Sequence, residues 1–352
     1  MGVSLPPRSL RWTLAGDGEQ RSLLDEEVDP TRELRDVEYL HVRARTIIST
    51  VPASSRMPFR HTINAYRGCS HACTYCFARP THEYLGLNGA EDFERRIVVK
   101  INAVERFAAE LSRPGWQGEH IAMGTNTDPY QQCEGRYRLT RRIIETLGAA
   151  RNPFSILTKS TMVLRDLDVL AAAAARTSVR VNLSIGTLDE QVWRNSEPGT
   201  PPPLRRVEAV ARLNAAGIRC GVLVAPILPG ISDGDEQLEA VVKACLEAGA
   251  VSVASIGLHL RPGVRELFMP WLEGFRPDLV ERYRTLYSAR GGYLAKDEGA
   301  RISSRVRQLV ERFGGCATGA GDSRADWGSD APVPLRRRVA PPAPPQQLPL
   351  VG

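Results

Sequence analysis

The sequence predicts an α/β protein in which parallel strands alternate with helices. Between roughly residues 60 and 290, short apolar runs recur, as expected for strands buried in a sheet. Each run is followed by a segment whose apolar residues are spaced as on one face of a helix. We count six such strand-then-helix units. They favour a parallel sheet covered by helices, either doubly wound or closed into a complete or partial barrel.

The expected elements follow one another in a regular order. Strands are predicted at residues 62–66, 120–124, 154–158, 179–185, 218–225 and 252–258. Helices are predicted at residues 98–111, 139–150, 164–176, 204–216, 236–248 and 264–288, the last with an interruption near Pro277. In both kinds of parallel sheet, ligands bind at the carboxyl ends of the strands. The residues at or just past these ends are Gly124, Lys159, Ser184, Pro226 and His259.

The two ends of the chain differ from this central region. Residues 1–59 mix charges with short apolar pieces and show no clear period, which predicts a flexible N-terminal extension before a core domain at 60–299. A C-terminal segment at 300–330 leads into a tail at 331–352 that holds seven prolines and three consecutive arginines. The tail cannot bury enough apolar surface to offset chain entropy, so we expect it to be disordered.

The composition is that of an ordinary globular protein, with 42% hydrophobic and 24% charged residues. No apolar run approaches the roughly 18–20 residues that a membrane span needs. Residues 1–20 are polar and lack the apolar core of a signal peptide. Seven cysteines is an odd number, and three of them lie within eight residues, unlike a secreted disulfide framework. We therefore expect a cytoplasmic protein without a membrane partner.

The net charge of +6 raises the question of a nucleic-acid partner. Only four of the 46 basic residues are lysines, and such an excess of arginine also results from a GC-rich genome. A basic excess this small supports an acidic partner only weakly. Nucleic acid therefore stays one of several open partner classes.

Three cysteines follow the first predicted strand as C-x3-C-x2-C, at Cys69, Cys73 and Cys76. Thiolates this close in sequence can bind one soft metal centre, and Gly68 allows the chain to turn tightly before them. A structural zinc ion usually takes four protein ligands, and most cubane iron–sulfur clusters take four cysteines. Three cysteines leave one coordination position open, which suits a cluster that binds a further ligand at one iron.

Two other interpretations of these cysteines are open. A zinc ion completed by His71 or His82 would make the chain a zinc-stabilised nucleic-acid-binding module without catalysis. A cluster without a further ligand would make it an electron-transfer protein. The six strand-then-helix units argue against the zinc module, because small zinc modules need no large α/β body.

The other cysteines carry weaker signals. Cys220 and Cys245 lie in an apolar strand and in a helix, where small buried thiols are common. Cys316 is uninformative. Cys133 follows a predicted strand end and so faces the expected site. It is either a hydrogen-atom donor or an incidental loop thiol.

With this cysteine motif after the first strand, residues 60–299 resemble the radical S-adenosylmethionine (SAM) superfamily. Within it the chain looks most like the spore photoproduct lyase-related group. The supporting segments are NAYRGC at 64–69, CFAR at 76–79, GTNTDPYQ at 124–131, TKS at 158–160 and VLVAPILPG at 222–230. The cysteine motif is highly specific in this context, and the later segments are moderately so.

The resemblance implies a partial (β/α)6 barrel and an enzyme. Cys69, Cys73 and Cys76 would hold a [4Fe–4S] cluster whose fourth iron binds SAM. Reductive cleavage of SAM would yield a 5′-deoxyadenosyl radical that abstracts hydrogen from an unidentified substrate, with nucleic acid and peptide both open. The electron would come from a reducing donor protein of the flavodoxin or ferredoxin type. The reaction class, lyase or transferase, is not specified.

The resemblance also implies roles for individual residues. Tyr75 would flank the adenine of SAM, and Ala225, between Val224 and Pro226, would pack against it. The residues near the SAM amino group, ribose and carboxylate would be Asn126, Thr127, Asp128, Ser184 and Glu197.

Several of these residues also have ordinary structural interpretations. Asp128 precedes Pro129 and is equally suited to cap a turn. Lys159, a catalytic candidate together with Cys133, is either directed into the site or solvated at a strand end. His259 is more simply interpreted as a packed or surface histidine.

One position departs from the family pattern. In spore photoproduct lyase a hydrogen-donating cysteine precedes the short stretch that corresponds to Asn126-Thr127-Asp128. Here Thr125 occupies that position, and a threonine O–H bond is too strong for the same role. We therefore do not predict photoproduct lyase activity.

Deleting residues 331–352 is expected to leave SAM cleavage unchanged, because the composition of the tail prevents it from forming a packed structure. Release of 5′-deoxyadenosine by the full and the shortened chain under the same reductant measures this. A large loss in the shortened chain would show that the tail folds onto the site.

Overall fold

The computed structural model describes residues 12–14, 37–55, 57–288 and 292–315. A curved seven-stranded sheet runs through it in the order β11-β10-β9-β8-β7-β4-β3. The strands are β3 (Ile48–Thr50), β4 (His61–Ile63), β7 (Ile121–Met123), β8 (Phe154–Thr158), β9 (Val179–Ser184), β10 (Cys220–Ile227) and β11 (Val253–Gly257). Only the pairing of β3 with β4 is antiparallel. The other six strands are parallel, which confirms the α/β class and the partial six-stranded barrel.

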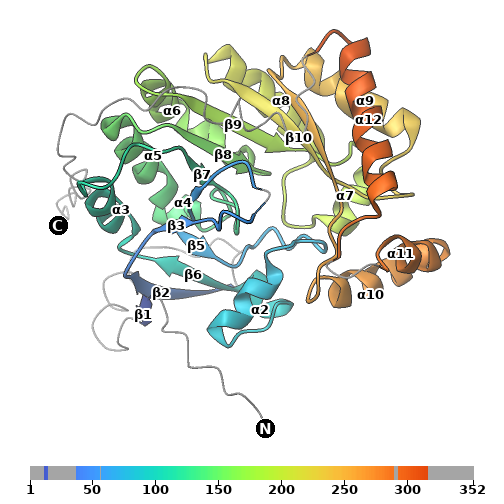
Figure 1. Cartoon of the computed structure of the whole chain (residues 1–352), viewed down its shortest axis with the longest axis horizontal. Coiled ribbons are helices and arrows are strands. Elements are labelled where there is room, and N and C mark those ends of the chain that lie inside the picture. Colours follow the sequence, from blue (N-terminus) through green and yellow to red (C-terminus); the bar gives the residue numbers. More distant parts are fainter. Residues whose placement is uncertain (1–11, 15–36, 56, 289–291, 316–352) are drawn as a thin grey trace, which may run out of the picture.

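Helices cover the outer side of this sheet, as Figure 1 shows for α3, α5, α6, α8, α9 and α12. The α-helices are α2 (Glu91–Arg95), α3 (Ala103–Leu111), α4 (Glu134–Tyr137), α5 (Leu139–Ala150), α6 (Leu167–Ala174), α7 (Glu190–Ser196), α8 (Pro203–Ala215), α9 (Asp235–Glu247), α10 (Arg265–Phe275), α11 (Val280–Leu286) and α12 (Lys296–Arg312). Within the described residues three 3-10 helices join them: η2 (Arg79–Leu85), η3 (Thr161–Asp166) and η4 (Pro277–Leu279). None of the described helices is long and apolar enough to cross a membrane.

A second, smaller sheet has the order β1-β2-β6-β5. Its strands are β1 (Trp12–Leu14), β2 (Glu38–Ala44), β5 (Tyr66–Arg67) and β6 (Arg96–Lys100). β2 and β6 are parallel, whereas β1 pairs with β2 and β5 with β6 in antiparallel fashion. Because β5 leads directly into the cysteines, this sheet supports the cysteine loop.

The structure corrects the sequence analysis at two places. Residues 98–100 belong to β6 and not to a helix, which begins only at Ala103. Ile97, Val98 and Val99 are all buried, and a β-branched run buried on both faces suits a strand better than a helix. Within residues 1–59, β2 and β3 pair with β6 and β4, so part of the N-terminal extension completes both sheets.

Elsewhere some predicted bounds match the structure and others do not, since the predicted strand 62–66 is divided between β4 and β5. Helix 139–150 and strand 154–158 have the predicted bounds. The predicted limit at residue 299 falls inside α12, which places Ile302, Val306, Leu309 and Val310 in the core. The predicted tail at 331–352 and Cys316 lie outside the described residues.

Two apolar clusters hold the fold together. The main cluster fills the space between the large sheet and its helices, with Ile144, Leu147 and Ile156 fully buried. A fully buried aliphatic side chain of this size contributes about 1.5–3 kcal/mol. The smaller cluster is built around α10 and α11 and also contains Cys73 and Tyr75. The cysteine loop is therefore packed against this second cluster.

Replacing Gly124 with alanine is expected to destabilise the protein by about 2–4 kcal/mol. The residue has φ +86° at the end of β7, and a Cβ there would lie 1.9 Å from the Leu157 carbonyl oxygen. A left-handed backbone costs about 1 kcal/mol and forced overpacking about 1–3 kcal/mol more. Urea unfolding measures the loss.

Gly217→Ala is the matched control, because Gly217 has φ +75° but no heavy atom within 4 Å of the added Cβ. It should lose only the backbone contribution of about 1 kcal/mol. Equal losses in the two variants would contradict the steric argument.

Candidate active site

The cysteine loop begins at Gly68, where any side chain would force the neighbouring backbone to move. Gly68 has φ +76°, and a Cβ on it would lie 2.8 Å from the Phe93 carbonyl oxygen. The same oxygen accepts a 2.8 Å hydrogen bond from the Cys69 N–H. Short turns follow, in which the N–H groups of Ala72 and Cys76 donate to the carbonyls of Cys69 and Cys73. The loop therefore has little regular structure of its own.

The three thiols lie close together in a buried environment. Cys69 and Cys73 are 7% and 6% exposed, and Cys76 is half-buried. Burial raises the pKa of all three thiols, and the charges of Cys73 and Cys76 raise that of Cys69 further. Binding of a metal centre would release the protons of these thiols to solvent, because the ligands are thiolates. Such a soft, buried donor set suits iron–sulfur chemistry.

The neighbouring histidines have partners other than these thiols. His71 Nδ1 lies 3.4 Å from Asp128 Oδ2. His82 Nε2 lies 3.1 Å from the Arg96 carbonyl oxygen, and its ring packs edge-on against Phe93. Within the described residues, no three Cys, His, Asp or Glu side chains converge on one ion position. A cubane cluster does not need such convergence, because each thiolate would bind a different iron.

Arg79 holds the loop from one side. This side chain is 3% exposed, and it donates to the carbonyls of Cys73 and Ala72 over 3.0 and 3.2 Å. It also donates to the carbonyls of Gly89 and Ala90 and pairs with Glu94. Its donors are thus shared between the cysteine loop and the start of α2. We did not single out Arg79 from the sequence, although it lies in the CFAR segment.

Gln131 and Thr127 hold the loop from the other side. The Gly68 carbonyl accepts from Thr127 Oγ1 at 2.5 Å and from Gln131 Nε2 at 3.1 Å. Gln131 Oε1 in turn accepts from the Ser70 N–H at 3.0 Å. Thr127, predicted to contact SAM, is thus engaged with the loop backbone. Asn126 lies nearby, with its side chain donating to Thr81 Oγ1 over 3.2 Å.

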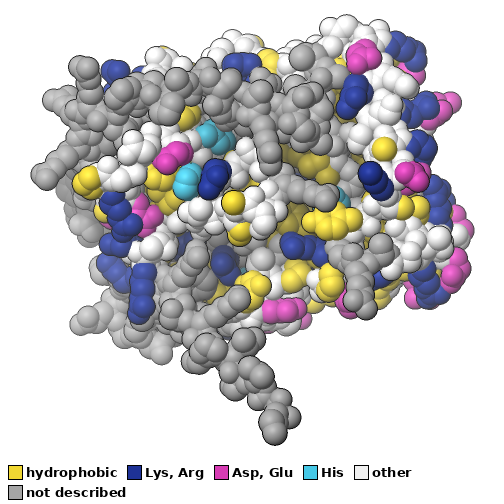
Figure 2. All heavy atoms as spheres, in the orientation of Figure 1, with side chains coloured by type: hydrophobic (Ala, Val, Ile, Leu, Met, Phe, Trp, Pro, Cys, Tyr) yellow, Lys and Arg dark blue, Asp and Glu magenta, His cyan; other side chains and the backbone are white. Residues whose placement is uncertain are grey.

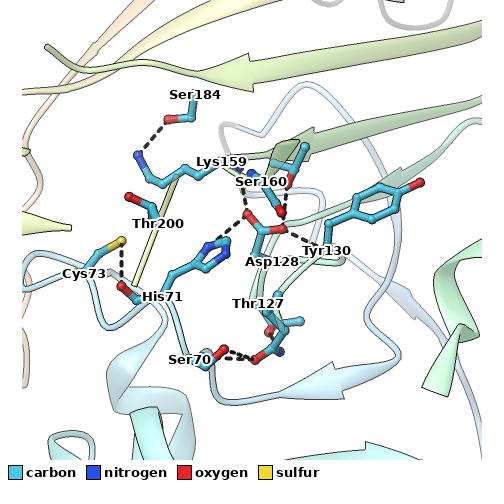
Figure 3. Close-up of polar contacts among 12 residues, drawn as sticks. Ser70, His71, Cys73, Thr127, Asp128, Tyr130, Lys159, Ser160, Ser184 and Thr200 are labelled. Atoms are coloured by element: carbon cyan, nitrogen blue, oxygen red, sulfur yellow. Dashed lines mark hydrogen bonds and ion pairs between the residues drawn. The ribbon is translucent and has the colours of Figure 1, made fainter. Parts of the chain in front are cut away.

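Asp128 connects the cysteine loop with the end of β8, as Figure 3 shows. Its carboxylate accepts from Thr158 Oγ1 at 2.6 Å and from the Lys159 and Tyr130 N–H groups at 2.8 and 2.9 Å. Burial alone would raise the pKa of Asp128, but His71 and these hydrogen bonds hold it below its ordinary value. Asp128 therefore does cap the local turn, and it also bridges two parts of the site.

Lys159 is directed inward and is not solvated at the strand end. Its Nζ donates to Ser184 Oγ at 3.0 Å, to Glu197 Oε1 at 2.9 Å and to the Ala225 carbonyl at 3.2 Å. Ser184 Oγ donates to the same Ala225 carbonyl at 2.8 Å. The ammonium also lies 5.6 Å from the centre of the Tyr75 ring. Five of the sequence-predicted residues thus meet at one point.

Glu197 lies at the centre of this group and is 4% exposed. It accepts from the Tyr75 hydroxyl, and its second oxygen is 2.5 Å from Arg206 Nη2. Burial would raise the pKa of Glu197, but the charges of Arg206 and Lys159 hold it well below the ordinary range. The carboxylate is therefore ionised at neutral pH and balances the two cations.

Arg206 is a site residue that the sequence analysis missed. It is 1% exposed and also donates to the carbonyls of Ser184 and Pro201 over 3.1 and 2.9 Å. A signal was present, because Arg206 shares the buried stripe of α8 with Ala209, Val210 and Leu213. A charged residue on the apolar stripe of a helix usually has a buried partner.

Two predicted residues lie apart from this group. Cys133 is 2% exposed, precedes α4 and packs in the main apolar cluster beside Tyr66. Its role as a hydrogen-atom donor stays a prediction. His259 is exposed and packs edge-on against Tyr293, with ring centres 4.9 Å apart, in keeping with the surface interpretation.

The fold and the three-cysteine loop define the class of protein. The family model of the radical SAM superfamily matches residues 63–244, and the chain belongs to this superfamily. An uncharacterised protein of Mycobacterium tuberculosis is 45% identical over 277 residues, or 79% of this chain and 81% of that protein. An uncharacterised protein of the Acidianus two-tailed virus is 30% identical over 206 residues, or 56% of this chain and 67% of that protein.

A solved structure has a similar fold. Spore photoproduct lyase complexed with dinucleoside spore photoproduct superimposes with a TM-score of 0.61 over 80% of this chain and 81% of that chain, at 20% identity. At this identity the likeness concerns the fold alone.

Replacing Glu197 with glutamine is expected to destabilise the metal-free protein by about 3–5 kcal/mol at pH 7, because Lys159 and Arg206 would lose a buried counter-charge. The folded-state pKa of Glu197 is depressed, so its contribution is complete above the unfolded value of about 4.3 and is lost as pH falls below it. Urea unfolding of both proteins between pH 7 and 3.5 measures this. A difference in stability that does not shrink over that range would contradict the assignment.

Proposed function

We propose that this protein is a radical SAM enzyme that holds a [4Fe–4S] cluster on Cys69, Cys73 and Cys76. The observation that supports the proposal most is a loop of two buried thiols and one half-buried thiol beside a paired polar group at the carboxyl ends of the barrel strands. When bound and reduced, the cluster supplies the electron that cleaves SAM to methionine and the 5′-deoxyadenosyl radical, which takes a hydrogen atom from substrate. The cofactor supplies this chemistry, and the protein supplies position and exclusion of water.

The residues of the chain have distinct tasks in this proposal. Arg79 and Gln131 fix the loop backbone, so the three thiols keep one arrangement. Lys159 offers a partly buried cation to the carboxylate of SAM, and Glu197 balances that cation before SAM arrives. The Tyr75 ring, held by its hydroxyl on Glu197, forms a wall beside the cluster loop. Because these groups are already paired and buried, little reorganisation is needed when the cofactors bind.

The remaining assignments follow from the same proposal. The electron donor is a reducing protein of the flavodoxin or ferredoxin type. The compartment is the cytoplasm, whose reducing conditions suit both such donors and an oxygen-sensitive cluster. A nucleic acid is the first substrate class to test, because a protein of similar fold binds a dinucleoside photoproduct. Thr125 occupies the position of the hydrogen-donating cysteine of spore photoproduct lyase, which argues against photoproduct cleavage as the reaction.

Cys73→Ala is expected to lose the cluster and to reduce SAM cleavage more than 100-fold, because two thiolates hold a cubane poorly. Anaerobically reconstituted wild-type protein should contain roughly four irons per chain and release 5′-deoxyadenosine under dithionite. Iron and sulfide assays, together with chromatography of the nucleoside, measure both effects.

Cys245→Ala is the matched control, since Cys245 is an equally buried thiol on α9 in the main apolar cluster. It should keep full iron content and cleavage. Wild-type protein that holds one zinc ion and leaves SAM intact would instead support the zinc-stabilised nucleic-acid-binding module.

A further inference from the structure

The turn that follows α7 packs directly on the cysteine loop. It leads from α7 towards α8 and consists of Ser196, Glu197, Pro198, Gly199 and Thr200. Pro198 is exposed, whereas Ser196, Glu197 and Thr200 are buried. Figure 3 shows Thr200 on the side of the site where His71 and Cys73 lie. The turn therefore presents its inner side to the cysteines and only its tip to solvent.

The turn holds the backbone on both sides of Cys73. The Gly199 N–H donates to the His71 carbonyl over 3.1 Å, two residues before Cys73. The Ser196 carbonyl accepts from the Thr74 N–H at 3.0 Å, directly after Cys73. Buried backbone groups in a loop without regular structure need such partners. Cys73 thus lies between two backbone groups that are both tied to another part of the chain.

A side-chain contact adds to these backbone bonds. The Tyr75 hydroxyl donates to the Glu197 carboxylate, so a third residue of the loop is held by the same turn. Glu197 also pairs with Lys159 and Arg206. The turn therefore connects the buried charges of the site with the segment that contains Cys73.

Gly199 brings the turn closer to the loop than a residue with a side chain could. A Cβ on Gly199 would lie 2.2 Å from the Ser70 carbonyl oxygen and 2.9 Å from His71 Cα. Both are backbone atoms of the loop, so they cannot rotate away as the end of a flexible side chain can. Gly199 is not among the residues with positive φ. The obstacle to a side chain is therefore the loop itself and not the conformation of the turn.

The turn is closed by contacts of its own. The Thr200 hydroxyl donates to the Glu197 carbonyl over 2.8 Å and accepts from Trp193 Nε1 at 2.9 Å and from Arg206 Nη2 at 2.5 Å. A hydroxyl has one donor and two acceptor positions, so all three are used. The Thr200 N–H donates to the same Glu197 carbonyl over 3.1 Å. A turn fixed in this way can hold the loop rather than follow its movements.

We infer that the turn at residues 196–200 is the positioning element of the Cys73 thiol, and that Gly199 is the residue that makes the close contact possible. The inference rests on the proposed function, in which Cys73 is a cluster ligand, and adds to it a support from a distant part of the chain. The turn forms no bond to the cluster and acts through the backbone of the cysteine loop. Groups that hold metal ligands in place contribute strongly to metal affinity.

The test compares three variants with the wild-type protein. Gly199→Ala places a methyl group against the loop backbone. Trp193→Phe is milder, because it removes only the bond from the indole N–H to the Thr200 hydroxyl. Gly148→Ala is the matched control, since its added Cβ would lie 3.1 Å from Ala173 Cβ, at a tight contact on α5. Figure 1 shows α5 well apart from α7.

The first measurement uses metal-free protein and needs no cluster. Alkylation by iodoacetamide is followed at Cys73 and at Cys245, with tandem mass spectrometry locating the label. Both thiols are buried, and Cys245 lies in the main apolar cluster, away from the loop. Figure 2 shows hydrophobic side chains near the middle of one face and Lys and Arg along its right-hand edge. An uncharged reagent is used because surface charge does not change its local concentration.

We expect Gly199→Ala to be alkylated at Cys73 at least about fivefold faster than wild type, with Cys245 unchanged, because only the loop opens. Trp193→Phe should change the Cys73 rate in the same direction by about twofold. Gly148→Ala should keep the wild-type ratio of the two rates.

The second measurement uses anaerobically reconstituted protein. Gly199→Ala should release iron to a chelator at least about tenfold faster than wild type, because the support of one ligand is displaced. The electron paramagnetic resonance spectrum of its reduced cluster should also differ from that of wild type, which a loss of global stability alone would not produce. Gly148→Ala should match wild type in both respects.

Other results would overturn the inference. Unchanged alkylation of Cys73 in folded Gly199→Ala, or equal gains at Cys73 and Cys245, would show that the turn does not hold this thiol. If Gly199→Ala does not fold, Trp193→Phe decides, and a wild-type Cys73 rate there counts against the inference. If wild-type protein neither holds a cluster nor cleaves SAM, the proposed function fails, whereas the alkylation rates still report on the position of Cys73.

Discussion

The site depends on buried donors that hold the backbone of the cysteine loop. The loop has almost no regular secondary structure, so its carbonyl groups need partners from elsewhere in the protein. Arg79 donates hydrogen bonds to the carbonyls of Ala72 and Cys73, and Gln131 and Thr127 donate to that of Gly68. The chain after α7 closes the third side, where a Cβ on Gly199 would lie 2.2 Å from the Ser70 carbonyl oxygen. The positions of three thiols are thereby set by polar contacts as much as by apolar packing.

A balance of buried charges forms the second layer of the site. Lys159 and Arg206 are both cations with little exposure, and Glu197 lies between them. An unpaired charge at such depth would be costly, so each of the three needs the others. The same carboxylate fixes the Tyr75 hydroxyl, which ties the charge balance to the cysteine loop. This carboxylate therefore couples the cysteine loop to the end of β8, and Lys159 extends the coupling to β9 and β10.

The smaller sheet gives the site a back wall that differs in character from the barrel. β5 brings Tyr66 up to the loop, α2 before β6 brings Phe93, and β2 extends the sheet outward. On the barrel side the residues that face the loop are polar and fully paired.

The sequence by itself determined the fold class and the order of βα units, and it singled out the three clustered cysteines, because these follow from local periodicity and spacing. It also placed Lys159 and Ser184 at strand ends, since parallel strands end at the same edge of a sheet. Only the tertiary structure decided which of these side chains meet, and it added Arg206, Arg79 and Gln131. The strands β2 and β6 escaped prediction because their pairing partners are distant in sequence, and a strand is stabilised by its neighbours more than by its own residues. Glu197 and Lys159 are 38 residues apart, and no local pattern encodes the contact between them.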